Sequence, residues 1–148
     1  MFKSILVPFD GSPGAEKALN QAIELIHYNR EDDSKLNILT VYRHHSMLEA
    51  SLSMVRPNEP GNMDDVMREH ATEVAERAKA IAKDAGCKNV HAFVSPGGVA
   101  RTIVKFADKH DNDLIVIGSR GMGSVEEYLL GSVSHKVTGL SKRPVLVI

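Results

Sequence analysis

The stretch ILVPFDGSPGAEKALNQAIELI, residues 5–26, decides how the chain folds. It opens with a short apolar run that ends at Asp10, which is typical of a buried strand. Ser12 is a suitable helix N-cap, and Pro13 is preorganised for the first helical position. Apolar residues then recur at helical spacing, at Ala15, Ala18, Leu19, Ala22, Ile23 and Ile26. The stretch therefore predicts a strand, a tight turn and a helix.

The rest of the chain repeats this alternation of strand and helix. We expect further strands at 36–42, 90–94, 114–117 and 145–148, and helices whose apolar faces lie within 67–85, 100–107 and 130–140. Asn62 and Asp65 suit the positive N-terminus of the second helix, and Gly86 suits a left-handed residue just past its end. The pattern predicts an α/β fold, a single doubly wound and mostly parallel sheet with helices on both faces.

Length and composition limit the classes of protein to which the chain can belong. A chain of 148 residues, 43% hydrophobic and 25% charged, can bury one core, so we expect one domain over residues 1–148. A net charge of −1 argues against a nucleic-acid partner, because binding phosphates normally needs a basic excess. The absence of Trp argues against a stacking surface for single strands.

Hydropathy and cysteine content indicate a cytoplasmic protein that is not inserted in a membrane. No apolar run approaches the ~20 residues that span a bilayer. The first nine residues predict a strand rather than a signal peptide. The single cysteine, Cys87, cannot form an intramolecular disulfide, which fits a reducing compartment.

Two glycine–serine clusters follow the predicted strand at 114–117 and point to anion binding. The first begins at Gly118, and the second, Gly131 to Ser134, comes after a further stretch of chain. Glycine lets a backbone approach a phosphate closely, and Ser132 and Ser134 can add hydroxyl donors. Doubly wound sheets bind ligands at the carboxyl ends of strands, where the strand order reverses. The alternative is that these glycines only turn the chain.

Two common phosphate-binding motifs are absent from this region. Residues 118–123 have the glycine spacing of a P-loop, but Ser124 and Val125 stand where Lys and Ser or Thr are required. Gly121 and Gly123 begin like a dinucleotide fingerprint, but Glu126 occupies the position of its third glycine. The sequence supports neither a P-loop NTPase nor a Rossmann dehydrogenase.

The glycine spacing resembles that of the universal stress proteins, specifically the ATP-binding branch. The signature of that branch, G-x2-G-x9-G-[ST], is matched at every fixed position by Gly118, Gly121, Gly131 and Ser132. The resemblance runs from ILVPFDGS at 5–12 to PVLVI at 144–148. It implies a five-stranded parallel sheet in the order 3-2-1-4-5, in which the reversal lies between the first and fourth strands.

The resemblance also implies where ATP, with or without Mg²⁺, would bind. The residues placed around the nucleotide are Pro8, Phe9, Asp10, Val41, Ile117, Gly118, Arg120, Gly121, Gly131, Ser132, Val133 and Ser134. The Asp10 carboxylate would face the nucleoside, and the main chain of Val41 would hold the adenine. Residues 117–121 would border the ribose and inner phosphates, and residues 131–134 would hold the outer phosphates. For Arg120 this role rests on its charge alone, and Asp10 has the alternative of an ordinary turn aspartate before Ser12.

Other features add less to the functional interpretation. His44 and His45 are adjacent and point to opposite faces of an extended segment, so we expect no metal site. The segment 43–61 resembles family members that accompany TRAP-type transporters of compatible solutes. Its alternative is a short amphipathic helix that covers the sheet edge near the nucleotide.

Three functional hypotheses remain, of which the first is a nucleotide-dependent regulator of the stress response or of a partner such as a transporter. The second is a slow ATPase or phosphate-transferring enzyme, and the third is an interaction module without nucleotide. The intact glycines and serines favour the first over the third. The lack of a P-loop lysine and of a carboxylate pair for magnesium and water favours a protein that is not an enzyme.

The last predicted strand indicates a homodimer. Residues 145–148 form an apolar edge strand in the order 3-2-1-4-5, and no charged side chain discourages pairing there. A second copy across a two-fold axis would satisfy the exposed backbone, and the resemblance implies the same contact. The alternative is a monomer whose tail is covered by a helix.

Overall fold

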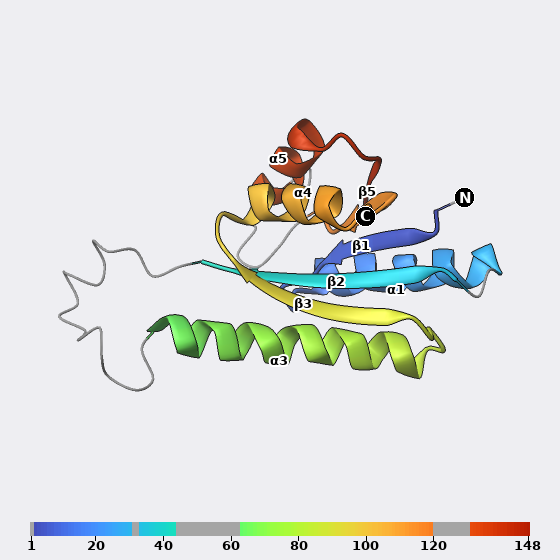
Figure 1. The fold of residues 1–148 in the computed structure, drawn as a ribbon, viewed down its shortest axis with the longest axis horizontal. Coiled ribbons are helices and arrows are strands. Elements are labelled where there is room, and N and C mark those ends of the chain that lie inside the picture. Colours follow the sequence, from blue (N-terminus) through green and yellow to red (C-terminus); the bar gives the residue numbers. More distant parts are fainter. Residues whose placement is uncertain (1, 31–32, 44–62, 120–130) are drawn as a thin grey trace.

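The computed structural model describes residues 2–30, 33–43, 63–119 and 131–148. Its elements follow in the order β1 (Ser4–Pro8), α1 (Pro13–Asn29), β2 (Lys35–Tyr42), α3 (Met63–Asp84), β3 (Val90–Pro96), α4 (Val99–Lys109), β4 (Leu114–Ile117), α5 (Ser132–Leu140) and β5 (Val145–Val147) (Figure 1). The predicted alternation of strands and helices is confirmed. The segment with the transporter-associated resemblance lies outside the described residues, apart from Arg43.

The strands form one parallel sheet in the order β3-β2-β1-β4-β5, as the family resemblance implied. The helices α1 and α3 pack on one face of this sheet, and α4 and α5 pack on the other (Figure 1). The strand order reverses between β1 and β4, which pair directly through Ile5 with Leu114 and Leu6 with Ile115. The carboxyl ends of β1 and β4 therefore lie side by side.

Local signals set the ends of the helices where the sequence predicted them. The Ser12 hydroxyl accepts a hydrogen bond from the amide of Ala15 at 3.1 Å and caps α1. Gly86, just after α3, has a φ of +98°, a conformation that side chains disfavour. These residues therefore mark the start of α1 and the end of α3.

Each face of the sheet buries its own apolar cluster. The α1–α3 face contains Ile5, Val7, Leu19, Leu36, Ile38 and Val116, with further residues of α1 and α3. The α4–α5 face contains Leu6, Leu39, Ile103, Ile115, Ile117 and Val137. All four residues of β4 are buried, as the uniformly apolar run predicted.

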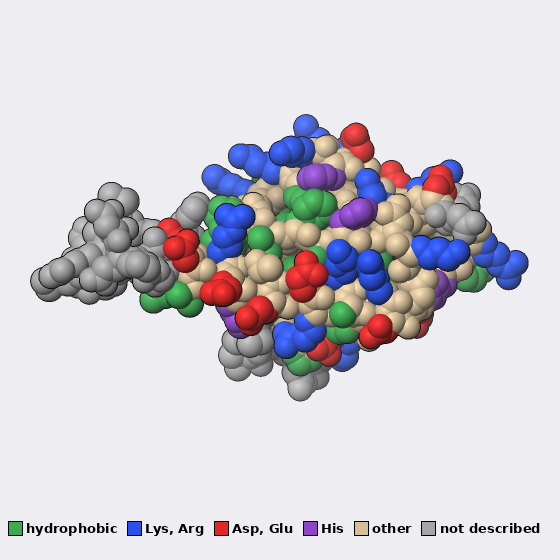
Figure 2. Space-filling model, turned by 60° about the horizontal axis from the view of Figure 1, so that its bottom comes forward, with side chains coloured by type: hydrophobic (Ala, Val, Ile, Leu, Met, Phe, Trp, Pro, Cys, Tyr) green, Lys and Arg blue, Asp and Glu red, His purple; other side chains and the backbone are tan. Residues whose placement is uncertain are grey.

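The outer surface of α3 carries charges of both signs. Figure 2 shows Asp, Glu, Lys and Arg side chains intermixed on the side of the molecule that Figure 1 assigns to α3. Such a mixed surface is an ordinary solvated face. Within the described ranges, no helix combines the length and the apolar character needed to cross a membrane.

Candidate functional site

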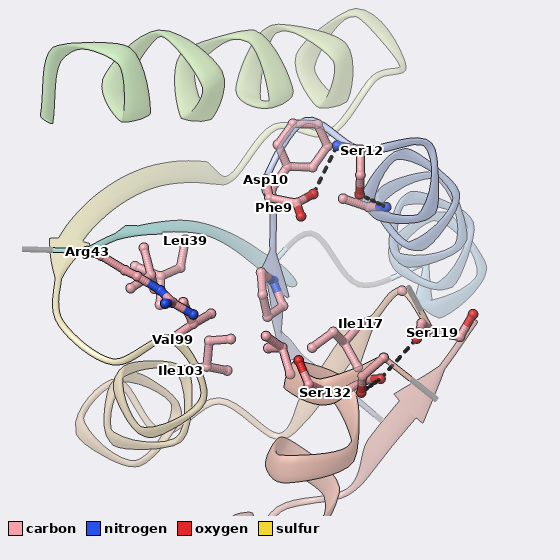
Figure 3. A pocket seen from close by; sticks show the side chains of 17 residues that line it. Phe9, Asp10, Ser12, Leu39, Arg43, Val99, Ile103, Ile117, Ser119 and Ser132 are labelled. Carbon is pink, nitrogen blue, oxygen red and sulfur yellow. Dashed lines mark hydrogen bonds between the residues drawn. The ribbon is translucent and has the colours of Figure 1, made fainter. Parts of the chain in front are cut away.

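A cavity of about 370 Å³ lies at the carboxyl ends of β1, β2 and β4 (Figure 3). Its volume falls in the range of small-molecule sites, roughly 300–1,000 Å³. The predicted site residues that the structure describes all line it: Pro8, Phe9, Asp10, Val41, Ile117, Gly118, Gly131, Ser132, Val133 and Ser134. Arg120 and Gly121 lie outside the described residues. The fold thus brings together segments more than 100 positions apart in the sequence, at the point where the strand order reverses.

The end of β1 is held against β2 by two hydrogen bonds around Phe9. The Phe9 amide donates to the carbonyl of Leu39 at 2.8 Å, and the Thr40 hydroxyl donates to the Phe9 carbonyl at 2.8 Å. The Phe9 side chain is buried in the α1–α3 core. These contacts fix the main chain where the strand turns toward the cavity.

Asp10 is an exposed residue at the mouth of the cavity. Its carboxylate accepts a hydrogen bond from the Ser12 amide at 2.9 Å (Figure 3). This is the geometry of a turn aspartate, so the structural role considered for Asp10 is present in the molecule. The same turn places the carboxylate among the cavity-lining groups, and the two roles are therefore compatible.

Gly118 lets β4 leave the sheet in close contact with α1. A Cβ at this position would lie 2.7 Å from both the carbonyl carbon and the carbonyl oxygen of Gly14. Real Cβ atoms essentially never come that close to a backbone. Gly118 therefore has a packing role in addition to lining the cavity.

The first turn of α5 is anchored to the end of β4 through Ser119. The Ser119 carbonyl accepts hydrogen bonds from the Gly131 amide and from the Ser134 hydroxyl, the latter at 3.1 Å. The Ser134 hydroxyl also lies 3.0 Å from the carbonyl of Gly131. A hydroxyl has one proton to donate, so in this structure Ser134 uses it to hold the loop ends together.

Ser132 remains as the hydroxyl donor of the second cluster. It is exposed and is the first residue of α5. Gly131 is the N-cap and supplies no side-chain cap hydrogen bond. The start of a helix has amide groups without intrahelical partners and a partial positive charge, and it therefore attracts anions.

Several lining residues were not among the predicted site residues: Ser12, Ala15, Leu39, Arg43, Val99, Ile103 and Ser119. Val99 and Ile103 are four residues apart on α4 and form an apolar wall. Arg43 extends from the end of β2 toward Val99 (Figure 3). Leu39, Val41 and Arg43 alternate along the β2 segment and thus share one face. This alternation is the feature of the sequence that could have indicated these lining residues. The same pattern, however, occurs at core positions and at cavity walls.

The described part of the chain contains no group of metal ligands and no exposed thiol. Its His, Cys, Asp and Glu residues form no cluster of three or more that could hold a metal ion. His44 and His45 lie outside that part. Cys87 is buried in the α1–α3 core, and this burial raises the pKa of its thiol, which lowers its reactivity.

Comparisons with known proteins agree with this architecture. Universal stress protein YxiE of Bacillus subtilis is 35% identical over 151 residues, covering 100% of this chain and 99% of that protein. Universal stress protein MJ0531 of Methanocaldococcus jannaschii is 31% identical, covering 100% and 82%.

Solved structures show the same similarity. The structure of MJ0577 has a TM-score of 0.80 at 28% identity, covering 100% of this chain and 96% of that chain. A universal stress protein in complex with cAMP has a TM-score of 0.71 at 26% identity, covering 99% and 96%. The universal stress protein family model matches residues 1–148. This chain belongs to the universal stress protein family.

Proposed function

We propose that this protein is an adenine-nucleotide-binding regulator that holds ATP, with or without Mg²⁺, in the 370 Å³ cavity. One observation carries the proposal: the end of β1, Gly118 and Ser119 of the first glycine–serine cluster, and the second cluster at 131–134 line the same cavity. The structural neighbour in complex with cAMP supports an adenine nucleotide as the ligand class.

The chemistry of the cavity walls suggests an orientation for the nucleotide. Val41, Val99 and Ile103 provide apolar surface that suits a purine base. Ser132 and the amides at the start of α5 suit phosphate groups, because they are donors at the positive end of a helix. Asp10 can accept hydrogen bonds from ribose hydroxyls.

We propose that the protein acts by binding rather than by catalysis. Hydrogen-bond donors that hold phosphate do not by themselves activate water, which needs a positioned base or a metal ion. Phosphate release should therefore be far slower than the ~1 s⁻¹ of an ordinary enzyme. A faster rate that survives repurification and disappears in the Ser132→Ala variant would identify an ATPase instead.

A homodimer through β5 is part of the same proposal. β5 is an edge strand, and Leu146 on it is 37% exposed. The Ile148 amide bonds inward to the Ile117 carbonyl, so the amide of Val147 faces the open edge. Val147→Pro should therefore block pairing with a second copy without removing a hydrogen bond of the sheet. Light scattering should report a dimer for the wild type and a monomer for this variant, whereas identical masses would contradict the interface.

We also propose a cytoplasmic location and a protein partner whose activity depends on the nucleotide. The resemblance of segment 43–61 makes a TRAP-type transporter of compatible solutes one candidate. Copurification with such a transporter in the presence and absence of ATP would test it.

The decisive experiment for nucleotide binding introduces a negative charge at the start of α5. In Ser132→Glu a carboxylate replaces the hydroxyl where phosphates are proposed, while an acidic residue at a helix N-terminus does not harm the fold. Calorimetry should show ATP affinity reduced at least about tenfold, because like charges repel at close range. Thr138→Glu adds the same charge to the same helix at an exposed position that does not line the cavity.

Three results would contradict nucleotide binding at this cavity. The first is a wild-type protein that neither binds ATP in calorimetry nor releases a nucleotide on denaturation. The second is equal ATP affinity in the wild type and in folded Ser132→Glu. The third is an equal loss of affinity in Ser132→Glu and Thr138→Glu.

A further inference from the structure

A second depression, which we call the α4–α5 groove, lies where the beginning of α4 meets the outer surface of α5. Its volume is about 840 Å³. Arg43, Arg101, His135 and Lys136 line it, and no Asp or Glu of the described residues does. No ion pair within the described ranges uses any of these four side chains. The groove is therefore a concave surface with positive charge, to which the described residues contribute no counter-ion.

The rest of the groove is apolar or lacks side chains. Val99, Ala100 and Leu140 contribute apolar surface, and Leu140 is 51% exposed. Gly98 and Gly139 also line the groove, and a Cβ at either position would meet nothing within 4 Å. At these two positions the groove is open because glycine has no side chain, and no neighbouring atom is close enough to require a glycine. Apolar surface beside cationic groups suits a ligand with a flat apolar part and an anionic part.

The groove continues from the nucleotide cavity. Arg43 and Val99 line both of them. On α5, Ser132 lines the cavity, while His135 and Lys136, three and four residues later, line the groove. Residues at these spacings are neighbours on one helix face. A ligand whose phosphates lie at Ser132 would therefore have the cations of the groove directly beyond them.

We propose that the α4–α5 groove is a second nucleotide subsite, so that this protein takes a dinucleotide, two nucleosides joined through phosphates. The inference rests on the proposed function for the first nucleoside, which occupies the 370 Å³ cavity. The second base lies against Ala100 and Leu140, and the linking phosphates meet Arg101 and Lys136. Both positions follow from matching charge and polarity between ligand and surface.

Diadenosine tetraphosphate and ATP, each titrated by calorimetry, test this subsite. The wild type should bind the dinucleotide at least about tenfold more tightly than ATP, since the second nucleoside then binds at high effective concentration. The Arg101→Gln, Lys136→Gln double variant should lose most of this gain while its ATP affinity changes less than about twofold. The matched control is Lys105→Gln with Lys142→Gln, which removes the same charge from positions on and just after these helices that do not line the groove. The control should retain the tighter binding of the dinucleotide relative to ATP.

The outcomes separate this inference from the proposed function. If the wild type binds ATP but binds the dinucleotide no more tightly, the second subsite is rejected and the ATP site stands. If the groove variant keeps the gain, or the control loses as much, the assignment to Arg101 and Lys136 is wrong. If neither ligand binds, both proposals fail. If a Glu-rich peptide binds the groove and the dinucleotide shows no gain, the groove is a protein-docking surface and the dinucleotide proposal is overturned.

Discussion

Both faces of the sheet are covered by amphipathic helices, yet the α1–α3 face is largely closed and the α4–α5 face supplies most of the helical residues that line the two cavities. On the closed face, α1 and α3 have 17 and 22 residues. On the open face, α4 and α5 have only 11 and 9. These two shorter helices begin beside the carboxyl ends of β3 and β4, and residues of their first turns, Val99 and Ser132, line the 370 Å³ cavity. The position of α4 and α5 beside these strand ends, rather than their apolar pattern, thus distinguishes the face that supplies most of the helical lining from the face that mainly stabilises.

The largest expected effect compares one buried side chain from each face. Leu19 on α1 is fully buried, and Leu19→Ala should lower the free energy of unfolding by about 3 kcal/mol, because it leaves a cavity in a packed core. Ile103 on α4 is also buried but borders the existing cavity, so Ile103→Ala should cost about 1.5 kcal/mol. Urea denaturation measures both. Equal losses would show that the two faces are packed alike.

A second comparison uses two glycines. Gly118→Ala should destabilise the fold by about 2 kcal/mol, because its Cβ meets the Gly14 backbone at 2.7 Å and α1 must shift. Gly139→Ala meets nothing and lies in α5, so it should stabilise the fold by about 0.5 kcal/mol through helix propensity. Thermal unfolding of both variants gives the sign of each change. A neutral Gly118→Ala would mean that β4 and α1 can separate without cost.

The smallest expected effect is a change of stability with pH, which arises at the end of α4 that lies away from the cavity. His110 stacks on Phe106 with ring centroids 3.9 Å apart and also contacts Phe93, at 5.2 Å. Burial, followed by the charges of Lys109 and Lys35, lowers the pKa of His110 below its ordinary value of 6.5. As the pH falls through 6.5, the unfolded chain takes up this proton before the folded chain does. Stability should therefore decrease on acidification until the pH passes below the folded pKa.

The control for this titration is His110→Phe, which keeps an aromatic ring and removes the titrating group. Urea midpoints at about pH 7.5 and about pH 5.5 should fall further for the wild type than for the variant. Identical pH dependence in the two proteins would show that the ring is solvated as well in the folded chain as in the unfolded chain.

The sequence predicted some residues of the candidate site and missed others. Asp10 and Gly118 were predictable because turn residues directly after apolar strands are local signals, and Ser132 because it belongs to a second glycine–serine cluster. The family resemblance paired them across the chain. The contribution of Val99 and Ile103 was not predictable, because an apolar residue on a helix face has the same pattern whether it meets another side chain or a cavity. Ser134 was predicted as a phosphate donor, but its hydroxyl hydrogen bonds with the Ser119 and Gly131 carbonyls depend on where the two loop ends meet.

The sequence by itself determined the alternation of strands and helices, the caps at Ser12 and Gly86, and the apolar faces, because each depends on residues within a few positions of one another. The order of the strands came from the family resemblance, because periodicity does not specify which strands pair. Only the tertiary structure decided that Gly118 must have no side chain, since the atoms that exclude one belong to Gly14, about a hundred residues earlier. It also decided that Arg43 lines both the cavity and the α4–α5 groove. Both properties depend on contacts between segments that are far apart in the sequence, and local sequence patterns do not specify such contacts.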